Sequence, residues 1–146
     1  MKRLFSSCLI GLGLTLALCG CDRGKAPAQA EAPAFPLQKI DTVTGTGKEA
    51  VAGATVVVNY TGWIHEPNSP QQHGAQFDSS IGRSPFTFPL GAGQVIPGWD
   101  QGVQGMKVGG KRTLVVPAAL GYGSMGVGPI PPNSNLIFDV ELLEVR

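Results

Sequence analysis

The sequence predicts an α+β domain in which an antiparallel sheet packs against one short helix. Several short segments alternate β-branched or aromatic residues with polar ones, which is typical of half-buried strands. Glycine and proline separate these segments, and the 146 residues include 21 Gly and 12 Pro. Only one segment begins as a helix does, and it lies late in the chain. Repeated βαβ units and a parallel sheet are therefore not expected.

Five segments are expected to form strands. They lie around residues 38–44, 55–61, 86–88, 111–116 and 136–145. The second is the clearest, because Val56, Val58 and Tyr60 fall on one face of an extended chain. Pro117 follows the fourth segment and is expected to end it, because proline cannot donate a hydrogen bond to a neighbouring strand.

The helix is expected to begin at Pro97 and to end near Met106. Proline suits the first turn, where the amide hydrogen that it lacks would be unpaired. Gly98 allows the backbone to approach a neighbour closely, and Trp99 supplies a side chain large enough to form the floor of a pocket. Asp100 falls in the first turn, where the helix dipole favours a carboxylate.

The first 20 residues are expected to be a signal peptide. Lys2 and Arg3 precede an apolar run at 9–18, which is shorter than the roughly 20 residues that span a membrane. The run ends in Leu-Cys-Gly-Cys at 18–21, which resembles the lipobox of bacterial lipoproteins. In a lipobox the last cysteine, here Cys21, receives lipid and becomes the amino terminus. An ordinary secretory signal that is cut nearby is the alternative.

This interpretation divides the chain into three parts. They are a lipoprotein signal peptide at 1–20, the lipidated Cys21 with an Ala/Pro-rich tether at 21–36, and one domain at 37–146. It predicts an exported protein that a lipid on Cys21 anchors to the inner or outer membrane, facing the periplasm. All three cysteines lie at or before Cys21, so the domain has no disulfide. A tether of this length favours a monomer.

Composition excludes nucleic acid as a partner. Without Lys2 and Arg3 the chain carries 9 basic and 10 acidic residues, whereas proteins that bind nucleic acid have a basic patch. The glycines at 121–126 fit the dinucleotide pattern G-x-G-x-x-G, but the residues that follow are Val-Gly-Pro-Ile-Pro-Pro. They cannot open the helix that would receive the pyrophosphate, so this segment is expected to be a turn.

Metal and hydrolase sites are not expected. His65 and His73 flank a polar stretch at 66–72, and only Glu66 is close enough in sequence to act as a third ligand. We therefore expect the stretch to be an exposed loop and both histidines to be solvated. The chain has no G-x-S-x-G motif and no evident pair of catalytic carboxylates. What remains is a set of scattered apolar and aromatic residues, each of which alone is more typical of a core.

Seven short motifs follow one another along the chain. They are VVNYTG at 57–62, FDSS at 77–80, PFTF at 85–88, GQVIPGW at 93–99, GYG at 121–123, PPN at 131–133 and LIFDVEL at 136–142. In this order they resemble the FKBP (macrolide-binding immunophilin) family of peptidyl-prolyl cis-trans isomerases. The resemblance covers the chain from residue 37 to its end. It implies a curved antiparallel sheet of about five strands wrapped around the short helix, as a half-barrel. In this chain the 127–130 segment is one residue shorter than the family pattern.

The resemblance also implies the residues of the active site. It implies that the Ile96 amide and the Tyr122 hydroxyl bind carbonyl groups, and that Asp78 forms a polar wall held by Tyr60 and Arg83. The apolar lining that it implies consists of Tyr60, Phe77, Phe86, Val95, Trp99, Ile130 and Phe138, with Trp99 as the floor. It further implies catalysis of X-Pro rotation without a cofactor or metal, proline-containing polypeptides as substrates, and macrolides of the tacrolimus and rapamycin type as inhibitors. A weakly active chaperone or peptide-binding module with the same fold is the alternative.

Overall fold

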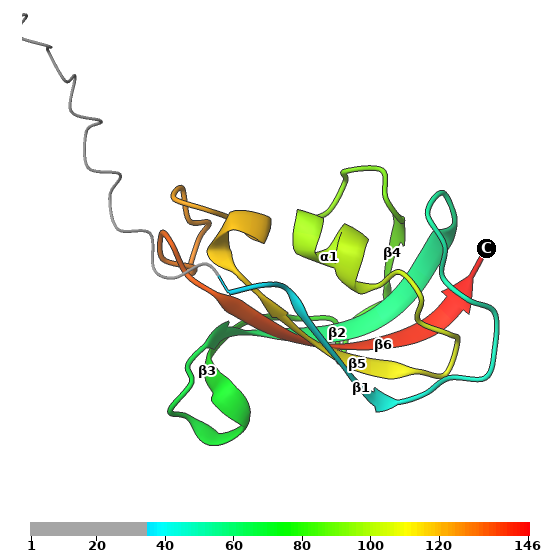
Figure 1. Ribbon diagram of the computed structural model, residues 1–146, viewed down its shortest axis with the longest axis horizontal. Coiled ribbons are helices and arrows are strands. Elements are labelled where there is room, and N and C mark those ends of the chain that lie inside the picture. The colour runs from blue at the N-terminus through cyan, green and yellow to red at the C-terminus, as the bar shows by residue number, and fades with distance from the viewer. Residues whose placement is uncertain (1–34) are drawn as a thin grey trace, which may run out of the picture. The chain divides into compact units, whose positions relative to one another are not determined.

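The computed structural model describes residues 35–146, which form an antiparallel sheet with a short helix on one face (Figure 1). The part of the chain that it describes contains six strands and one α-helix. They are β1 (Gln38–Val43), β2 (Thr55–His65), β3 (His73–Ser79), β4 (Phe86–Pro89), α1 (Pro97–Gly102), β5 (Lys111–Val116) and β6 (Leu136–Val145). Two 3-10 turns, η1 (Pro70–Gln72) and η2 (Ala118–Leu120), complete it. None of the helices in these residues is long and apolar enough to cross a membrane.

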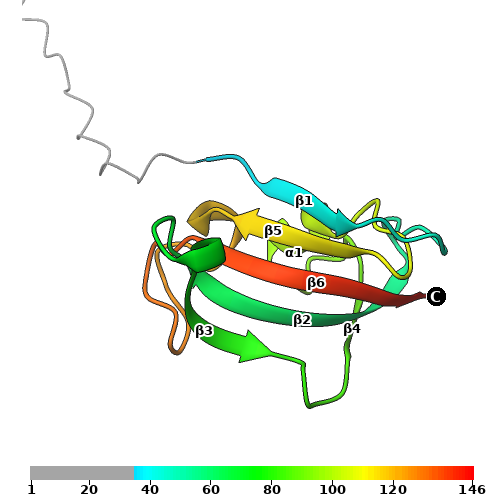
Figure 2. The same cartoon turned by 90° about the horizontal axis from the view of Figure 1, so that it is seen from below.

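The strands are ordered β1-β5-β6-β2-β3, and β4 pairs with the first half of β2 (Figure 2). Every pairing is antiparallel. The predicted fold class is therefore confirmed, as a curved sheet with one short helix. β2 changes its partner from β4 at residues 55–58 to β3 at residues 61–65, so the two short strands diverge where Asn59 and Tyr60 lie.

All five predicted strands are present, and one further strand was not predicted. β5 and β6 have the predicted bounds, whereas β2 continues to His65. The unpredicted strand, β3, has the sequence HGAQFDS, in which Phe77 is the one large apolar residue. It is an edge strand whose pairing with β2 shifts register twice. Because few of its side chains enter the core, it lacks the alternation by which a strand is recognised.

The core lies between the inner face of the sheet and α1. Val56 and Val58 of β2 and Leu114 and Val116 of β5 have no exposed surface. Two glycines let the helix rest directly on β5. A Cβ atom at Gly98 would lie 2.4 Å from a methyl carbon of Val116. One at Gly102 would lie 2.7 Å from Leu114, so the close approach that the sequence indicated at Gly98 is confirmed.

The helix ends at Gly102 rather than near Met106, so its predicted length was wrong. The chain turns at Gly105, whose φ of 82° lies in the left-handed region, which interrupts a helix. The side chain of Arg112 closes this end of the helix. Its Nη1 donates hydrogen bonds to the carbonyl oxygens of Gly102 at 2.8 Å and Gln104 at 3.0 Å. Its Nε pairs with Asp41 of β1 at 2.5 Å.

The two histidines are not solvated loop residues, so that expectation was wrong. His65 ends β2 and His73 begins β3. The ring of His73 stacks on Trp63 with a centroid distance of 3.8 Å and an interplanar angle of 5°. Its side chain is 16% exposed. The intervening residues 66–72 are mostly exposed, as expected, and residues 35–146 contain no cluster of three or more groups that could hold a metal.

Candidate active site

A cavity of about 510 Å³ opens beside α1 on the inner face of the sheet. We call it the aromatic cavity. Its lining consists of Tyr60, Phe77, Asp78, Phe86, Gly93, Gln94, Val95, Ile96, Trp99, Tyr122 and Phe138. Nine of the ten residues that the sequence assigned to the pocket therefore meet around one space. They come from β2, β3, β4, β6, α1 and two loops, so only the folded chain brings them together.

Ile130 is the exception. It is 5% exposed and belongs to the core, and it does not line the aromatic cavity. Its backbone exchanges two hydrogen bonds with Val127, at 3.1 and 2.9 Å, which close a tight turn in the short 127–130 segment. The side chain of Ile130 packs in the core, so it is not among the residues that line the aromatic cavity.

Trp99 forms the floor of the aromatic cavity and is 4% exposed. Two rings stand nearly perpendicular to its indole: Tyr60 at 4.9 Å and 83°, and Phe138 at 5.3 Å and 85°. Phe86 lies 6.0 Å away at 71°, and Phe77 continues the wall through an edge contact with Phe138. Aromatic pairs favour these edge-to-face arrangements, so the walls are held by their own contacts.

Gly62 leaves room for two of these walls. A Cβ atom at this position would lie 2.7 Å from ring carbons of both Phe77 and Phe138, which is closer than real Cβ contacts come. The glycine pairs with Asp78 across β2 and β3 and with Phe138 across β2 and β6. Gly62 belongs to the motif at 57–62, but its role could not be predicted because it depends on rings that are distant in the sequence.

The polar wall is centred on Asp78. Its Oδ2 accepts a hydrogen bond from the Tyr60 hydroxyl at 2.5 Å. Its Oδ1 accepts from Arg83 Nη2 at 2.7 Å and from the Ser79 amide at 2.9 Å. Arg83 also donates to the carbonyl oxygen of Ser79. The arrangement of Tyr60 and Arg83 around Asp78 that the resemblance implied is therefore present.

These contacts hold Asp78 in its charged form. The hydrogen bond from Tyr60, followed by those from Arg83 and Ser79, lowers the pKa of the Asp78 carboxyl against the opposing effect of burial. Burial and then the hydrogen bond to Asp78 raise the pKa of Tyr60 to about 12. At neutral pH the wall therefore presents a carboxylate that is fixed by a protonated phenol.

Two hydrogen-bond donors of the lining are free to meet a ligand. Among residues 35–146, no hydrogen bond joins the Tyr122 hydroxyl or the Ile96 amide to another group of the protein. Burial raises the pKa of Tyr122, and the nearby charge of Asp78 adds to this, so the hydroxyl keeps its proton at neutral pH. The aromatic cavity thus combines apolar walls with two donors and one carboxylate.

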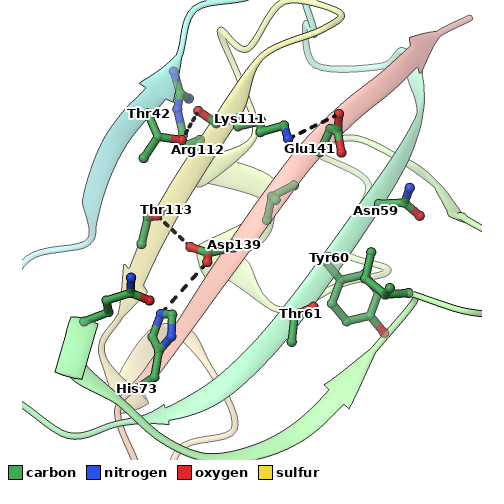
Figure 3. Close-up of a pocket in the computed structure, with 13 residues that line it drawn as sticks. Thr42, Asn59, Tyr60, Thr61, His73, Lys111, Arg112, Thr113, Asp139 and Glu141 are labelled. Carbon is green, nitrogen blue, oxygen red and sulfur yellow. Dashed lines mark hydrogen bonds and ion pairs between the residues drawn. The ribbon is translucent and has the colours of Figure 1, made fainter. Parts of the chain in front are cut away.

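A second cavity of about 500 Å³ lies on the outer face of the sheet and has a different character (Figure 3). We call it the outer groove. Asp139 lies at its centre, where it accepts a hydrogen bond from Thr113 at 2.7 Å and faces His73 at 4.0 Å. Lys111 and Glu141 form an ion pair at 3.9 Å. Several of its polar side chains pair with one another, and it is not lined by a cluster of aromatic rings as the aromatic cavity is.

Comparison with known proteins shows the family to which the chain is similar. Residues 47–143 match the family model described as FKBP-type peptidyl-prolyl cis-trans isomerase. The FK506-binding protein of Neisseria meningitidis serogroup A is 52% identical over 107 residues, which cover 72% of this chain and 92% of that protein. FK506-binding protein 1B of Neurospora crassa is 50% identical over 107 residues, which cover 73% and 95% of the two chains.

Solved structures show the same fold. The crystal structure of AtFKBP13 superimposes with a TM-score of 0.66 at 41% identity, covering 75% of this chain and 93% of that one. The crystal structure of FkpA from Escherichia coli gives a TM-score of 0.65 at 44% identity, covering 75% of this chain and 48% of FkpA. With the matched family model and the aromatic cavity, these similarities show that the chain belongs to the FKBP-type peptidyl-prolyl cis-trans isomerase family.

Proposed function

We propose that the chain isomerises X-Pro bonds in the aromatic cavity, with the prolyl ring lying over Trp99. Rotation about a peptide bond has a barrier of about 18–20 kcal/mol, because the planar form has partial double-bond character. The twisted transition state loses this resonance and carries less charge on the carbonyl oxygen. Apolar walls tolerate it better than the planar amide, which water stabilises by hydrogen bonding. The observation that carries the proposal is the closed set of aromatic rings around a buried floor.

The polar groups of the aromatic cavity take distinct roles in this proposal. The Ile96 amide and the Tyr122 hydroxyl donate hydrogen bonds to carbonyl groups of the substrate backbone and so hold the peptide in place. The carboxylate of Asp78 lies beside the carbonyl that precedes proline. It repels the more negative oxygen of the planar amide more than that of the twisted one, which favours rotation. Tyr60 and Arg83 keep Asp78 charged and oriented.

Two substitutions test this assignment. We expect Asp78→Asn and Tyr122→Phe to lower the turnover of a proline tetrapeptide while the thermal transition and circular dichroism remain unchanged. Asp139→Asn is the matched control, because it removes a half-exposed carboxylate from the outer face of the sheet. Unchanged turnover in both cavity variants would contradict the site. Peptide binding without turnover in the wild-type protein would favour the chaperone alternative.

The same cavity is proposed to bind macrolides of the FK506 type. Several relatives are named FK506-binding proteins, and three of them are 50–52% identical to this chain over 107 residues. A macrolide that occupies the aromatic cavity excludes the prolyl substrate. Inhibition of tetrapeptide turnover by FK506 or rapamycin is therefore expected to be competitive, and weakened by Tyr122→Phe, which removes a donor.

We further propose that the domain acts at a membrane surface, where it assists the folding of exported proteins as a monomer. Support comes from the sequence alone: the apolar run at 9–18, the Leu-Cys-Gly-Cys at 18–21 and the Ala/Pro-rich tether. Residues 1–34, which contain nearly all of this sequence, lie outside those that the structure describes. Sensitivity of processing to globomycin, loss of membrane association in Cys21→Ser, and fractionation of inner and outer membranes test it. Sedimentation of the 37–146 domain tests the monomer.

A further inference from the structure

The loop that joins β4 to α1 forms one side of the aromatic cavity, to which it contributes Gly93, Gln94, Val95 and Ile96. The ladder between β2 and β4 ends before it, and the last backbone bond there runs from the Leu90 amide to the Ala54 carbonyl at 2.8 Å. Within the described part of the chain, residues 91–95 make no backbone-to-backbone hydrogen bond. Something else must therefore hold this loop in place.

Asp100 supplies the contacts that the loop otherwise lacks. Its Oδ1 accepts a hydrogen bond from the Gly91 amide at 2.8 Å, and its Oδ2 accepts one from the Gly93 amide at 3.0 Å. Both glycines have left-handed backbones, with φ of 78° and 70°. Glycine adopts this conformation without strain, and with it the loop turns so that both amides face the Asp100 carboxylate. Hydrogen bonds to a charged acceptor are stronger than those between neutral groups.

Asp100 also adjoins the floor of the cavity. It follows Trp99 directly in α1, and the amides of both residues donate to the carbonyl oxygen of Ile96, at 3.3 and 2.9 Å. One helical turn therefore carries the floor, the junction with the loop, and the carboxylate that holds the loop. The sequence indicated a carboxylate that benefits from the helix dipole, whereas its oxygens are used by the loop amides.

We propose that Asp100 is a positioning residue that fixes the 91–95 loop relative to Trp99. Val95 and the Ile96 amide are thereby held where they meet the bound peptide. This inference rests on the proposed function of the aromatic cavity. It adds that the affinity for peptide and macrolide depends on a carboxylate that touches neither. Without the Asp100 carboxylate, the loop samples other conformations in the free protein. Ordering the loop then costs free energy when a ligand binds, and this cost weakens the affinity.

The test compares Asp100→Ala and Asp100→Asn with the wild-type protein. Alanine removes both acceptors, whereas asparagine keeps the shape and one oxygen, so its effect is expected to be smaller. We expect Asp100→Ala to raise KM for a proline tetrapeptide and Kd for FK506 by about tenfold, with kcat changed less. Hydrogen exchange at the Gly91 and Gly93 amides should become faster as KM and Kd rise. Asn keeps the test usable if alanine lowers folding yield.

Several outcomes would overturn the inference. KM and Kd that stay at wild-type values in both variants would do so, as would losses that follow only the unfolded fraction. The variants Asp78→Asn and Tyr122→Phe separate this failure from that of the proposed function. If those two variants lose activity while the Asp100 variants keep their affinity, only the role of Asp100 is wrong. If those two keep full activity, the assignment of the cavity is wrong.

Discussion

The Tyr60 hydroxyl donates a 2.5 Å hydrogen bond to Oδ2 of Asp78, and the two residues shift each other's ionisation in opposite directions. The bond lowers the pKa of Asp78 and contributes to raising that of Tyr60 to about 12. It also joins β2 to β3 at the point where β2 changes partner. One contact therefore contributes both to the charge at the polar wall and to the link between β2 and β3.

Tyr60→Phe is expected to lower activity without unfolding the protein. The ring that packs edge-on against Trp99 is kept, while Asp78 loses its strongest stabilising contact. A hydrogen bond of this kind contributes about 1 kcal/mol, so kcat/KM should fall by about fivefold. The pKa of Asp78 should rise toward its ordinary value. The acid limb of the pH profile, measured with a tetrapeptide, should therefore move to higher pH.

The sign of the stability effect follows from the same shift. A carboxyl whose pKa is lowered by folding stabilises the protein above its unfolded pKa, and this contribution disappears as pH falls through the folded pKa. Tyr60→Phe should therefore be less sensitive to acid in this range than the wild-type protein. Arg83→Gln is the control, because its guanidinium is 64% exposed and solvent screens it, so its effect should be smaller. If the acid limb of the pH profile lies at the same pH in the wild-type protein and in Tyr60→Phe, the coupling between Tyr60 and Asp78 is contradicted.

Alkaline titration provides an independent measurement on the same residue. The chain has two tyrosines, Tyr60 and Tyr122, and the pKa of each is raised above 10.0. Ultraviolet difference spectra should therefore show the tyrosinate signal at higher pH in the native protein than in the unfolded chain, with a step near pH 12 that Tyr60→Phe removes. A raised pKa stabilises the fold below the unfolded value and loses this effect as pH rises through the folded one. A step near 10.0 would contradict this prediction.

The strands were predicted best where one face is buried, because apolar and polar residues then alternate along the strand. β5 and β6 have their predicted bounds, while the polar edge strand with Phe77 escaped notice. The cavity residues followed from the resemblance to a family, since periodicity alone described Tyr60 and Trp99 only as core. The role of Gly62, and the role of Asp100 in holding the 91–95 loop, could not be predicted from the sequence. Each depends on groups that only tertiary structure brings near, namely two rings and two loop amides.

Gly62→Ala is expected to damage the aromatic cavity itself. The added methyl would lie 2.7 Å from both Phe77 and Phe138, so one ring must move into the space that the substrate needs. Overpacking of this kind costs about 1–3 kcal/mol. Activity should fall together with macrolide affinity, as measured by calorimetry. Gly53→Ala is the comparison: nothing lies within 4 Å of its Cβ, and its φ of 90° adds strain, so it should cost stability but not affinity.

Arg112→Met is expected to destabilise the protein without a direct effect on the cavity. Methionine replaces the apolar stem, but the carbonyl groups of Gly102 and Gln104 lose their donor and Asp41 loses its partner. Loss of hydrogen bonds to a charged group costs about 1.5–3 kcal/mol each, reduced here because Asp41 is half exposed. Urea unfolding should show a loss of about 2–3 kcal/mol. If Arg112→Met has the stability of the wild-type protein, α1 does not need the hydrogen bonds of Arg112 at its end.

The floor of the cavity can be probed through its one unusual feature. Trp99 Nε1 is buried and has no hydrogen-bond partner among the residues that the structure describes. Its indole is instead surrounded by the rings of Tyr60, Phe88 and Phe138. We therefore expect the indole to contribute mainly through its size and shape.

Trp99→Phe should then cost far less stability than Trp99→Ala. Phenylalanine removes the unpaired donor, and this gain offsets part of the free energy of unfolding that is lost with the smaller side chain. Alanine leaves a large cavity and is expected to cost about 3–5 kcal/mol. In urea unfolding we expect the loss for Phe to be less than half of that for Ala. Both variants should bind FK506 more weakly, because the floor recedes from the ligand. Equal losses of stability would mean that the indole N–H contributes more than its surroundings indicate.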